Sequence, residues 1–297
     1  MTYYNQFQWM FVFFTYCFIG WIWETCYVSI KERFFENRGF MKGPFLPIYG
    51  FGACIMLVSS MYVRDYPVLV FLFGLISATV MELATGILME KLFKVKYWTY
   101  AHEKFNYKGY ICVKSSLTWG VASLLLAYLL HKPIDALVMS IPEKILQNIV
   151  IVITIVAAMD FATSFKAALD LRDILVAVDR IKVELSRLQR RGEIIETFIT
   201  EGAAQKTQEL QAQFQEVIGS LANSKDAAMA ELSKIKELQQ TASDSLKSMF
   251  TENKSVTSLL RRNSQVVSKE YDDTLNAYKE KFINTVKGVF SKDEKDV

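Results

Sequence analysis

The distribution of apolar residues constrains this chain more than any other feature. Five apolar stretches occupy the first 165 residues, and the roughly 130 residues that follow contain no proline, tryptophan or cysteine. A helix needs about 20 apolar residues to cross a hydrocarbon core of about 30 Å. Residues 1–165 therefore predict a transmembrane domain, and residues 166–297 predict a cytosolic helical tail with coiled-coil character. The expected fold class is all-α, a polytopic membrane helix bundle.

The loops between the apolar stretches predict the orientation. Lysine and arginine concentrate in two alternate loops, Lys31–Lys42 and Lys91–Lys114, and basic loops face the cytosol. This pattern places the N-terminus outside the cell membrane and the tail inside. The second stretch is short and rich in glycine and serine, so it is the weakest of the five. The predicted spans are about Phe7–Ile30, Pro47–Val63, Tyr66–Met89, Ile111–Leu130 and Ile145–Phe165.

Three acidic residues lie inside the predicted spans, namely Glu24, Glu82 and Asp160. Charged groups at that depth are costly and are usually functional or paired. The predicted orientation places all three nearer the cytoplasmic ends of their helices. They could bind a ligand or an ion, they could pair structurally with a residue such as Lys114, or they could sit near the interface by chance.

The first cytoplasmic loop is rich in glycine and proline. Residues 39–52 hold four glycines and two prolines, which excludes a regular helix through the whole segment. Irregular backbone near a bilayer is stable only where protein or water satisfies its polar groups. The loop either folds back into the bundle as a ligand-facing element, with Arg38 and Tyr49 near the site, or forms a tight turn at the interface.

The second cytoplasmic loop is rich in aromatic residues. Trp98 and Tyr100 either anchor the chain at the membrane interface, where tryptophan and tyrosine are enriched, or contribute to the polar site. Asn106 followed by Gly109 indicates a turn. Lys114 opens the next span on the same side.

Composition excludes several functions. A net charge of +3 is too small to indicate nucleic-acid binding. Two histidines and four cysteines show no metal-ligand spacing, and with both histidines expected in loops no hydrolytic triad can be assembled. No phosphate-binding loop is present. We therefore expect no enzymatic activity, no metal and no cofactor, and any ATPase would be a separate chain.

Apolar residues of the tail follow a three-and-four spacing. Leu171, Ile174, Val178, Ile181, Leu185 and Leu188 form a heptad seam. Gly192 and Gly202 are expected to interrupt it, and it resumes at 210–221 and 271–282. Self-association and an intramolecular hairpin fit this pattern equally well. The arginines near the membrane either contact anionic lipid or lie on a solvated face; they are Arg187, Arg190 and Arg191.

The membrane half resembles the bacterial family of type IV, CmpB-like ABC-transporter permeases over about residues 7–165. The matching motifs are Gly20–Glu24, Asn37–Phe40 with Gly43-Pro44 and Pro47–Gly50, Trp98–Tyr100 with Phe105-Asn106 and Gly109, and Ser116 with Trp119-Gly120. The resemblance implies a permease. The family pattern has an acidic residue where this chain has Thr99, so no role that requires a carboxylate there is carried over.

The expected function is a permease or a membrane subunit of a transporter, with membrane lipid and a second copy or partner subunit around it. Its candidate ligand or ion site comprises Glu24, Glu82, Asp160, Arg38, Tyr49, Trp98, Tyr100, Asn106 and Lys114. The alternative is a membrane anchor whose coiled coil scaffolds partners at the inner membrane face. A membrane enzyme that acts on lipid has only the carboxylates in its favour.

Overall fold

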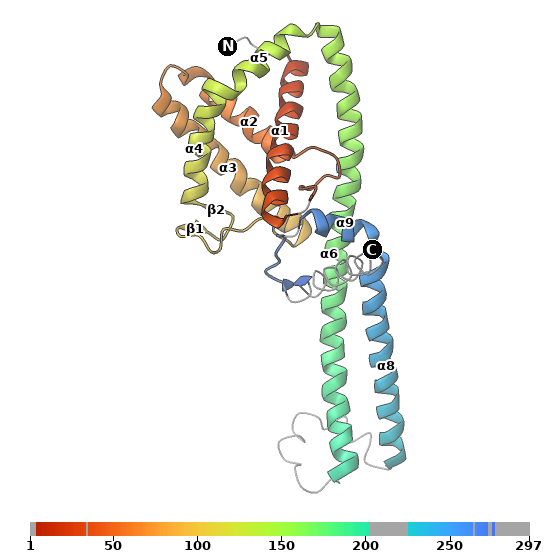
Figure 1. Cartoon of the computed structure of the whole chain (residues 1–297). Helices are drawn as coiled ribbons and strands as arrows, with labels where there is room; N and C mark the ends of the chain where they lie inside the picture. Colours follow the sequence, from red (N-terminus) through yellow and green to blue (C-terminus); the bar gives the residue numbers. More distant parts are fainter. Residues whose placement is uncertain (1–3, 34, 202–224, 264, 273–274, 277–297) are drawn as a thin grey trace, which may run out of the picture. The chain divides into compact units, whose positions relative to one another are not determined.

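The computed structural model describes residues 4–33, 35–201, 225–263, 265–272 and 275–276. Two compact units divide the chain. Unit 1 joins Met1–Arg172 with Ser255–Val297, and unit 2 is Asp173–Lys254. Within the described residues both units are built almost entirely of helices, which confirms the all-α prediction. Figure 1 shows these elements in their chain order.

Among the described residues, four helices that lie in unit 1 or begin there are long and apolar enough to cross a membrane. They are α1 (Gln6–Glu32), α3 (Pro67–Phe93), the continuous helix made of α4 (Val113–Leu125), η2 (Leu126–Leu130) and α5 (His131–Ser140), and α6 (Glu143–Glu201). Their large apolar side chains are widely exposed, as lipid-facing surfaces require. Four of the five predicted spans therefore correspond to long helices.

Local chemistry sets the ends of these helices. Asn5 caps α1, because its side chain accepts from the Gln8 N–H while the Gln8 side chain accepts from the Asn5 N–H. Pro67 occupies the first turn of α3, where its missing N–H costs nothing. Arg33 and Lys94 end α1 and α3 in the left-handed conformation, each with φ of 61°.

The remaining predicted span is a shorter helix. α2 (Pro47–Ser60) has 14 residues and is followed by the 3-10 turn η1 (Met61–Val63). Fourteen residues rise about 21 Å, less than a hydrocarbon core. α2 begins beside the middle of α1, where the Leu46 N–H donates to the Cys17 carbonyl at 3.0 Å. The loop before it re-enters the bundle. The second predicted stretch, the shortest and weakest of the five, is thus a helix too short to span alone, and the other four are long helices.

The helices pack through small residues. A Cβ added at Gly74 of α3 would lie 2.2 Å from Cβ of Ser123 in α4, so the two backbones approach closely there. Gly120 of α4 likewise leaves room for the Phe71 ring of α3. In membranes, where apolar burial gives little drive for association, close approach of this kind supplies packing energy.

A two-stranded hairpin connects α3 to α4. β1 (Asn106–Tyr107) pairs antiparallel with β2 (Ile111–Cys112). Lys108 and Gly109 form the turn, with φ values of 50° and 75°, which is the geometry of the tight hairpin turns. The Asn106 side chain accepts from the Gly109 N–H at 3.0 Å. The predicted turn is thus present and belongs to a hairpin.

Unit 2 is an antiparallel pair formed by the second part of α6 and by α8 (Lys225–Glu252). Gly192 does not interrupt α6, contrary to the prediction. It is buried, and a Cβ there would lie 3.7 Å from Ile235 of α8. Glycine lowers helix propensity by about 1 kcal/mol, and the contact with α8 outweighs that local cost. The contact is intramolecular, as in the hairpin alternative. Gly202 and the heptads at 210–221 and beyond 276 lie outside the described residues.

Candidate functional site

Glu82 is a buried carboxylate in the middle of the bundle. It lies on α3 and is 3% exposed. Tyr100 Oη donates to its Oε1 at 2.8 Å, and Trp119 Nε1 and Ser115 Oγ donate to its Oε2 at 3.0 and 3.3 Å. All three donors are neutral. The carboxylate is therefore satisfied by hydrogen bonds contributed from α4 and from the second loop.

Glu24 forms a second polar cluster with the first loop. Tyr49 Oη donates to Glu24 Oε1 at 3.0 Å, and Arg38 Nε lies 4.0 Å from Glu24 Oε2. Arg38 is buried, and its N–H donates to the Thr25 hydroxyl at 3.3 Å. Tyr49 also interacts electrostatically with Tyr100. The Glu24 and Glu82 clusters are therefore neighbours.

Asp160 of α6 holds the re-entrant loop through its backbone. The N–H groups of Lys42 and Gly43 donate to its two carboxylate oxygens at 3.1 and 2.7 Å. Asn37 closes the loop, because its amide donates to the Lys42 carbonyl at 2.7 Å and its Oδ1 accepts from Trp21 Nε1 at 2.7 Å. Two backbone donors on one carboxylate make Asp160 the anchor of the loop that leads into α2.

A family comparison bears on these three clusters. The family model described as "Putative ABC-transporter type IV" matches residues 11–165. The chain belongs to this family. The match spans more than half of the chain and includes all three carboxylates, which confirms the resemblance seen in the sequence. No curated protein and no solved structure matches the chain.

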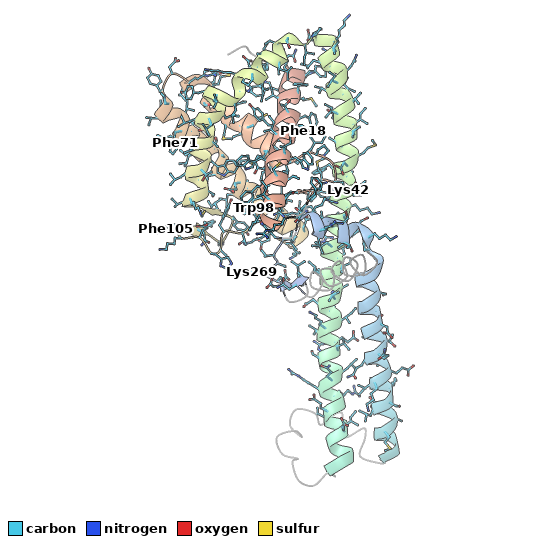
Figure 2. The ribbon with its side chains drawn as sticks, viewed as in Figure 1. Phe18, Lys42, Phe71, Trp98, Phe105 and Lys269 are labelled. Atoms are coloured by element: carbon cyan, nitrogen blue, oxygen red, sulfur yellow. The ribbon has the colours of Figure 1, made fainter. Side chains whose placement is uncertain are left out.

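The other predicted site residues of this type IV family member have different roles, and two of them support the hairpin. Trp98 Nε1 donates to the Tyr110 carbonyl at 3.1 Å, so Trp98 braces the hairpin instead of contacting a carboxylate. Asn106 serves the hairpin turn. Figure 2 shows Trp98 and Lys42, one from each loop, at the same end of the bundle. The second loop thus supplies Tyr100 to the Glu82 cluster, and Trp98 supports the hairpin.

Lys114 does not pair with Glu24 or Glu82. Its side chain is exposed, and Nζ lies 2.9 Å from Glu103 Oε1. The ion pair joins Lys114, in the first turn of α4, to Glu103 of the second loop, and both side chains are exposed. Lys114 is therefore not the structural partner of these carboxylates: Glu82 accepts from three neutral donors, and Arg38 lies beside Glu24.

A segment near the C-terminus also belongs to this face of the family member, and the sequence analysis missed it. Residues 255–272, here called the return segment, include most of α9 (Lys254–Arg262). Lys96 and Val267 exchange two backbone hydrogen bonds of 2.7 and 3.0 Å. Asn263 donates to the Gly39 carbonyl at 2.9 Å, and Ser268 donates to the Lys94 carbonyl at 2.8 Å. The return segment therefore ties both loops together.

A signal for the return segment was present in the sequence. Val256, Leu259 and Leu260 have the i, i+3, i+4 spacing of an amphipathic helix, and all three are buried. The predicted tail boundary at 166 placed them in the cytosolic helices. All three belong to unit 1, as does Asn263, whose side chain is also buried.

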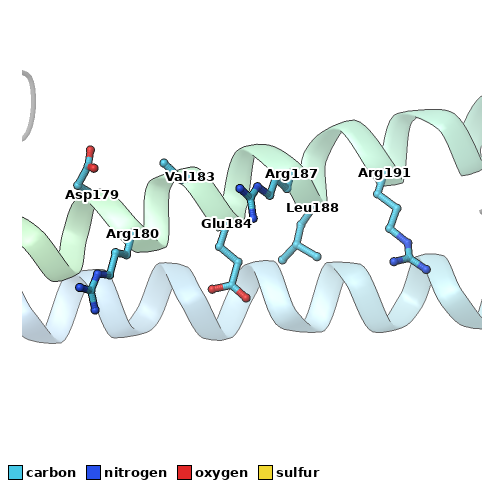
Figure 3. A pocket seen from close by; sticks show the side chains of 7 residues that line it. All are labelled: Asp179, Arg180, Val183, Glu184, Arg187, Leu188 and Arg191. Atoms are coloured by element: carbon cyan, nitrogen blue, oxygen red, sulfur yellow. The ribbon is translucent and has the colours of Figure 1, made fainter. Parts of the chain in front are cut away.

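The basic cluster of the tail lies along α6 in unit 2. Arg191 forms an ion pair with Glu231 of α8 at 2.7 Å. Figure 3 shows Arg191 among the side chains of α6 that line a shallow pocket, which are mostly charged, with Val183 and Leu188 as the apolar ones. Exposed ion pairs contribute at most about 1 kcal/mol. Arg191 thus supports the α6–α8 pair, and Arg187 and Arg190 are exposed.

Proposed function

We propose that this chain is a permease, or the membrane subunit of a transporter, whose ligand site comprises Glu82, Glu24 and Tyr49 beside the re-entrant loop. Family membership supports the transporter class. The observation that carries the site is the short helix α2 preceded by irregular chain in the bundle interior. Interrupted helices of this kind mark the binding sites of many transporters, because irregular backbone at that depth persists only around a site or inside protein.

The chemistry of the site favours a ligand that is positively charged or rich in hydrogen-bond donors. The three groups that donate hydrogen bonds to Glu82 are neutral, so none of these donors balances the negative charge of the carboxylate. A cation or a donor group can displace the Tyr100 or Ser115 hydroxyl and recover the hydrogen bond. Burial makes this electrostatic attraction stronger than it would be in water.

The energy source in this proposal is a separate ATPase chain or an ion gradient. The sequence holds no phosphate-binding loop of its own. Four long helices and one short helix are few for a complete transport path, so a second copy or a partner membrane subunit completes it. The cytoplasmic location proposed for both loops places the site within reach of such a partner.

Retention of a small molecule by the purified protein tests the site. Wild type, Glu82→Gln and Glu103→Gln are purified in parallel in lipid nanodiscs, and extracted small molecules are compared by mass spectrometry together with the melting temperature. Glu103→Gln is the matched control because it removes an exposed carboxylate near the same loop. We expect wild type and Glu103→Gln to retain a molecule that a folded Glu82→Gln loses at least tenfold.

Two outcomes decide against the site. If Glu82→Gln retains the same molecules as wild type, Glu82 does not bind the ligand. If Glu82→Gln lowers the melting temperature strongly while Glu103→Gln does not, Glu82 serves the stability of the bundle.

A scaffold role is the second candidate, because unit 2 is a compact unit of its own. Truncation after Arg191 would also remove the return segment, so it cannot separate the two functions. Replacing residues 173–254 by a flexible glycine-serine linker removes unit 2 alone. A permease keeps its retained ligand after this replacement, whereas a scaffold loses its function.

A further inference from the structure

A buried histidine lies at the end of the bundle that also holds the start of α1. His131 opens α5, is 2% exposed and contacts two tyrosines. Tyr16 Oη lies 3.0 Å from Nδ1, and Tyr4 Oη lies 3.1 Å from Nε2. Tyr4 also makes a short hydrogen bond to Asp135. The sequence analysis expected His131 in a loop, whereas the residue lies in the continuous helix Val113–Ser140.

The direction of each hydrogen bond follows from the chain of partners. The Tyr4 hydroxyl donates to the Asp135 carboxylate, so its oxygen accepts from His131 Nε2–H. Nδ1 of the neutral ring then accepts from the Tyr16 hydroxyl. The bonds thus run in one direction, from Tyr16 through His131 and Tyr4 to Asp135. Every donor in this chain has an acceptor.

The helix is irregular at this place. The π-helical turn η2 directly precedes His131, and Pro133 follows two residues later. Proline lacks the N–H that a regular helix needs, and π turns are frequent at functional sites. The irregular turn exposes the Ala127 carbonyl to Arg64, whose Nη2 donates to it at 2.5 Å.

Each element packed around the histidine contributes a titratable or charged group. Burial of the His131 ring opposes a positive charge there, Asp135 of α5 favours one, and Arg64, after η1, opposes it. Tyr4 precedes α1, and Tyr16 lies on α1. Cys54 of α2 interacts electrostatically with Tyr16. Asp135 is only half-buried, so the chain of hydrogen bonds reaches from the surface to a buried ring.

We propose that Tyr16, His131, Tyr4 and Asp135 form a proton-binding site at this end of the bundle. Uptake of one proton from water converts the imidazole to an imidazolium beside the Asp135 carboxylate. Alternatively, the Nε2 proton shifts to the Tyr4 oxygen and the Tyr4 proton shifts to Asp135, which leaves a neutral ring and a carboxylic acid. In both forms Nδ1 carries a proton, and no other bond is made or broken.

Both protonated forms have the same consequence for Tyr16. Because Nδ1 becomes a donor, the Tyr16 hydroxyl must turn from donor to acceptor. Tyr16 belongs to the buried core between α1 and α2, and the next residue, Cys17, receives the hydrogen bond of Leu46 that positions α2. Proton binding therefore acts on the helix that carries the re-entrant loop. This coupling to the loop rests on the proposed function, whereas the proton site itself does not.

Nitrogen NMR of a single-histidine protein tests the proposal. The chain has two histidines, so His102→Gln leaves only the His131 ring. Histidine labelled with nitrogen-15 is followed in lipid nanodiscs from pH 8.5 to pH 4.5. We expect Nε2–H and an unprotonated Nδ1 at high pH, and a proton on Nδ1 at low pH. If His102→Gln does not fold, the unsubstituted protein serves, and His131 is assigned by difference from His131→Gln.

Asp135→Asn and Asp65→Asn form the matched pair for this experiment. Both remove one negative charge at the same end of the bundle, but Asp65 is exposed and lies outside the hydrogen-bond chain. Asp135→Asn should lower the proton affinity of the network at least tenfold, and Asp65→Asn should change it less than twofold. Equal effects of the two variants overturn the proposal, as does an Nδ1 that stays unprotonated at pH 4.5 in folded protein. These results do not depend on any transported ligand, so they separate this proposal from the permease proposal.

Discussion

At the scale of single residues, the bundle keeps an acidic side chain in its interior by surrounding it with neutral donors. Removing one of several hydrogen bonds to a buried carboxylate leaves part of its desolvation uncompensated. The presence of Glu82 in an apolar span could be read from the sequence. Its partners could not, because Tyr100, Ser115 and Trp119 come from two later segments whose packing no local pattern specifies.

Tyr100→Phe should destabilise the protein by about 1–3 kcal/mol, since it removes the 2.8 Å hydrogen bond to Glu82 and leaves the packing of the ring. Tyr107→Phe is the control: Tyr107 is 53% exposed, and the change should cost less than about 0.5 kcal/mol. Unfolding in mixed micelles measures both. Equal stability of the two variants would show that Glu82 finds another donor.

At the scale of secondary-structure elements, hydrophobic length predicted the long helices and turn chemistry predicted the Asn106–Gly109 turn. The start of α2 in mid-bundle depended on tertiary contacts, and the Asp160–Gly43 bond joins residues 117 positions apart. Sequence reasoning also failed where the neighbouring residues give little indication of the secondary structure. His131 was expected in a loop, yet it opens α5, a helix in which Ile134 and Val138 are buried.

Gly50 and Gly52 of α2 differ in how much space surrounds them. A Cβ at Gly50 would lie 2.7 Å from the backbone oxygen of Phe13 and 2.4 Å from Sγ of Cys17, whereas a Cβ at Gly52 would meet only the flexible end of Met81 at 3.3 Å. Gly50→Ala should therefore cost about 1–3 kcal/mol through overpacking of α1 against α2. Gly52→Ala should be close to neutral. The same unfolding measurement compares them, and equal losses would contradict the close approach at Gly50.

At the scale of the whole molecule, the chain leaves the membrane domain, forms a separate helical pair and returns. The sequence predicts a membrane domain and a helical tail with a boundary at 166, and along the chain unit 1 passes into unit 2 at Asp173. The amphipathic spacing of Val256, Leu259 and Leu260 predicts a helix with a buried face but not what that helix packs against. The contacts with Gly39, Lys94 and Lys96 join residues more than 170 positions apart, which no local pattern specifies.

Orientation is tested by labelling one cysteine at the start of α6 and one on α8 of unit 2. Lys144 is exposed, next to Glu143, which binds Asn5, and Ser233 is exposed on α8. In a Cys26→Ser background, an impermeant maleimide should label Lys144→Cys in intact cells and Ser233→Cys only after permeabilisation, because basic loops stay in the cytosol. Labelling of both positions from one side would contradict the proposed orientation.

The return segment also sets an order of events during synthesis. Ser268 binds the Lys94 carbonyl across 174 positions of sequence. At about 5–20 residues per second, a ribosome needs about 10–35 s to make the chain between them. During that interval the two loops lack the return segment that joins them, while the helices are already being inserted into the membrane. A messenger cut short after the membrane domain would therefore yield an inserted but unclosed protein, which membrane quality control could recognise by its free loops.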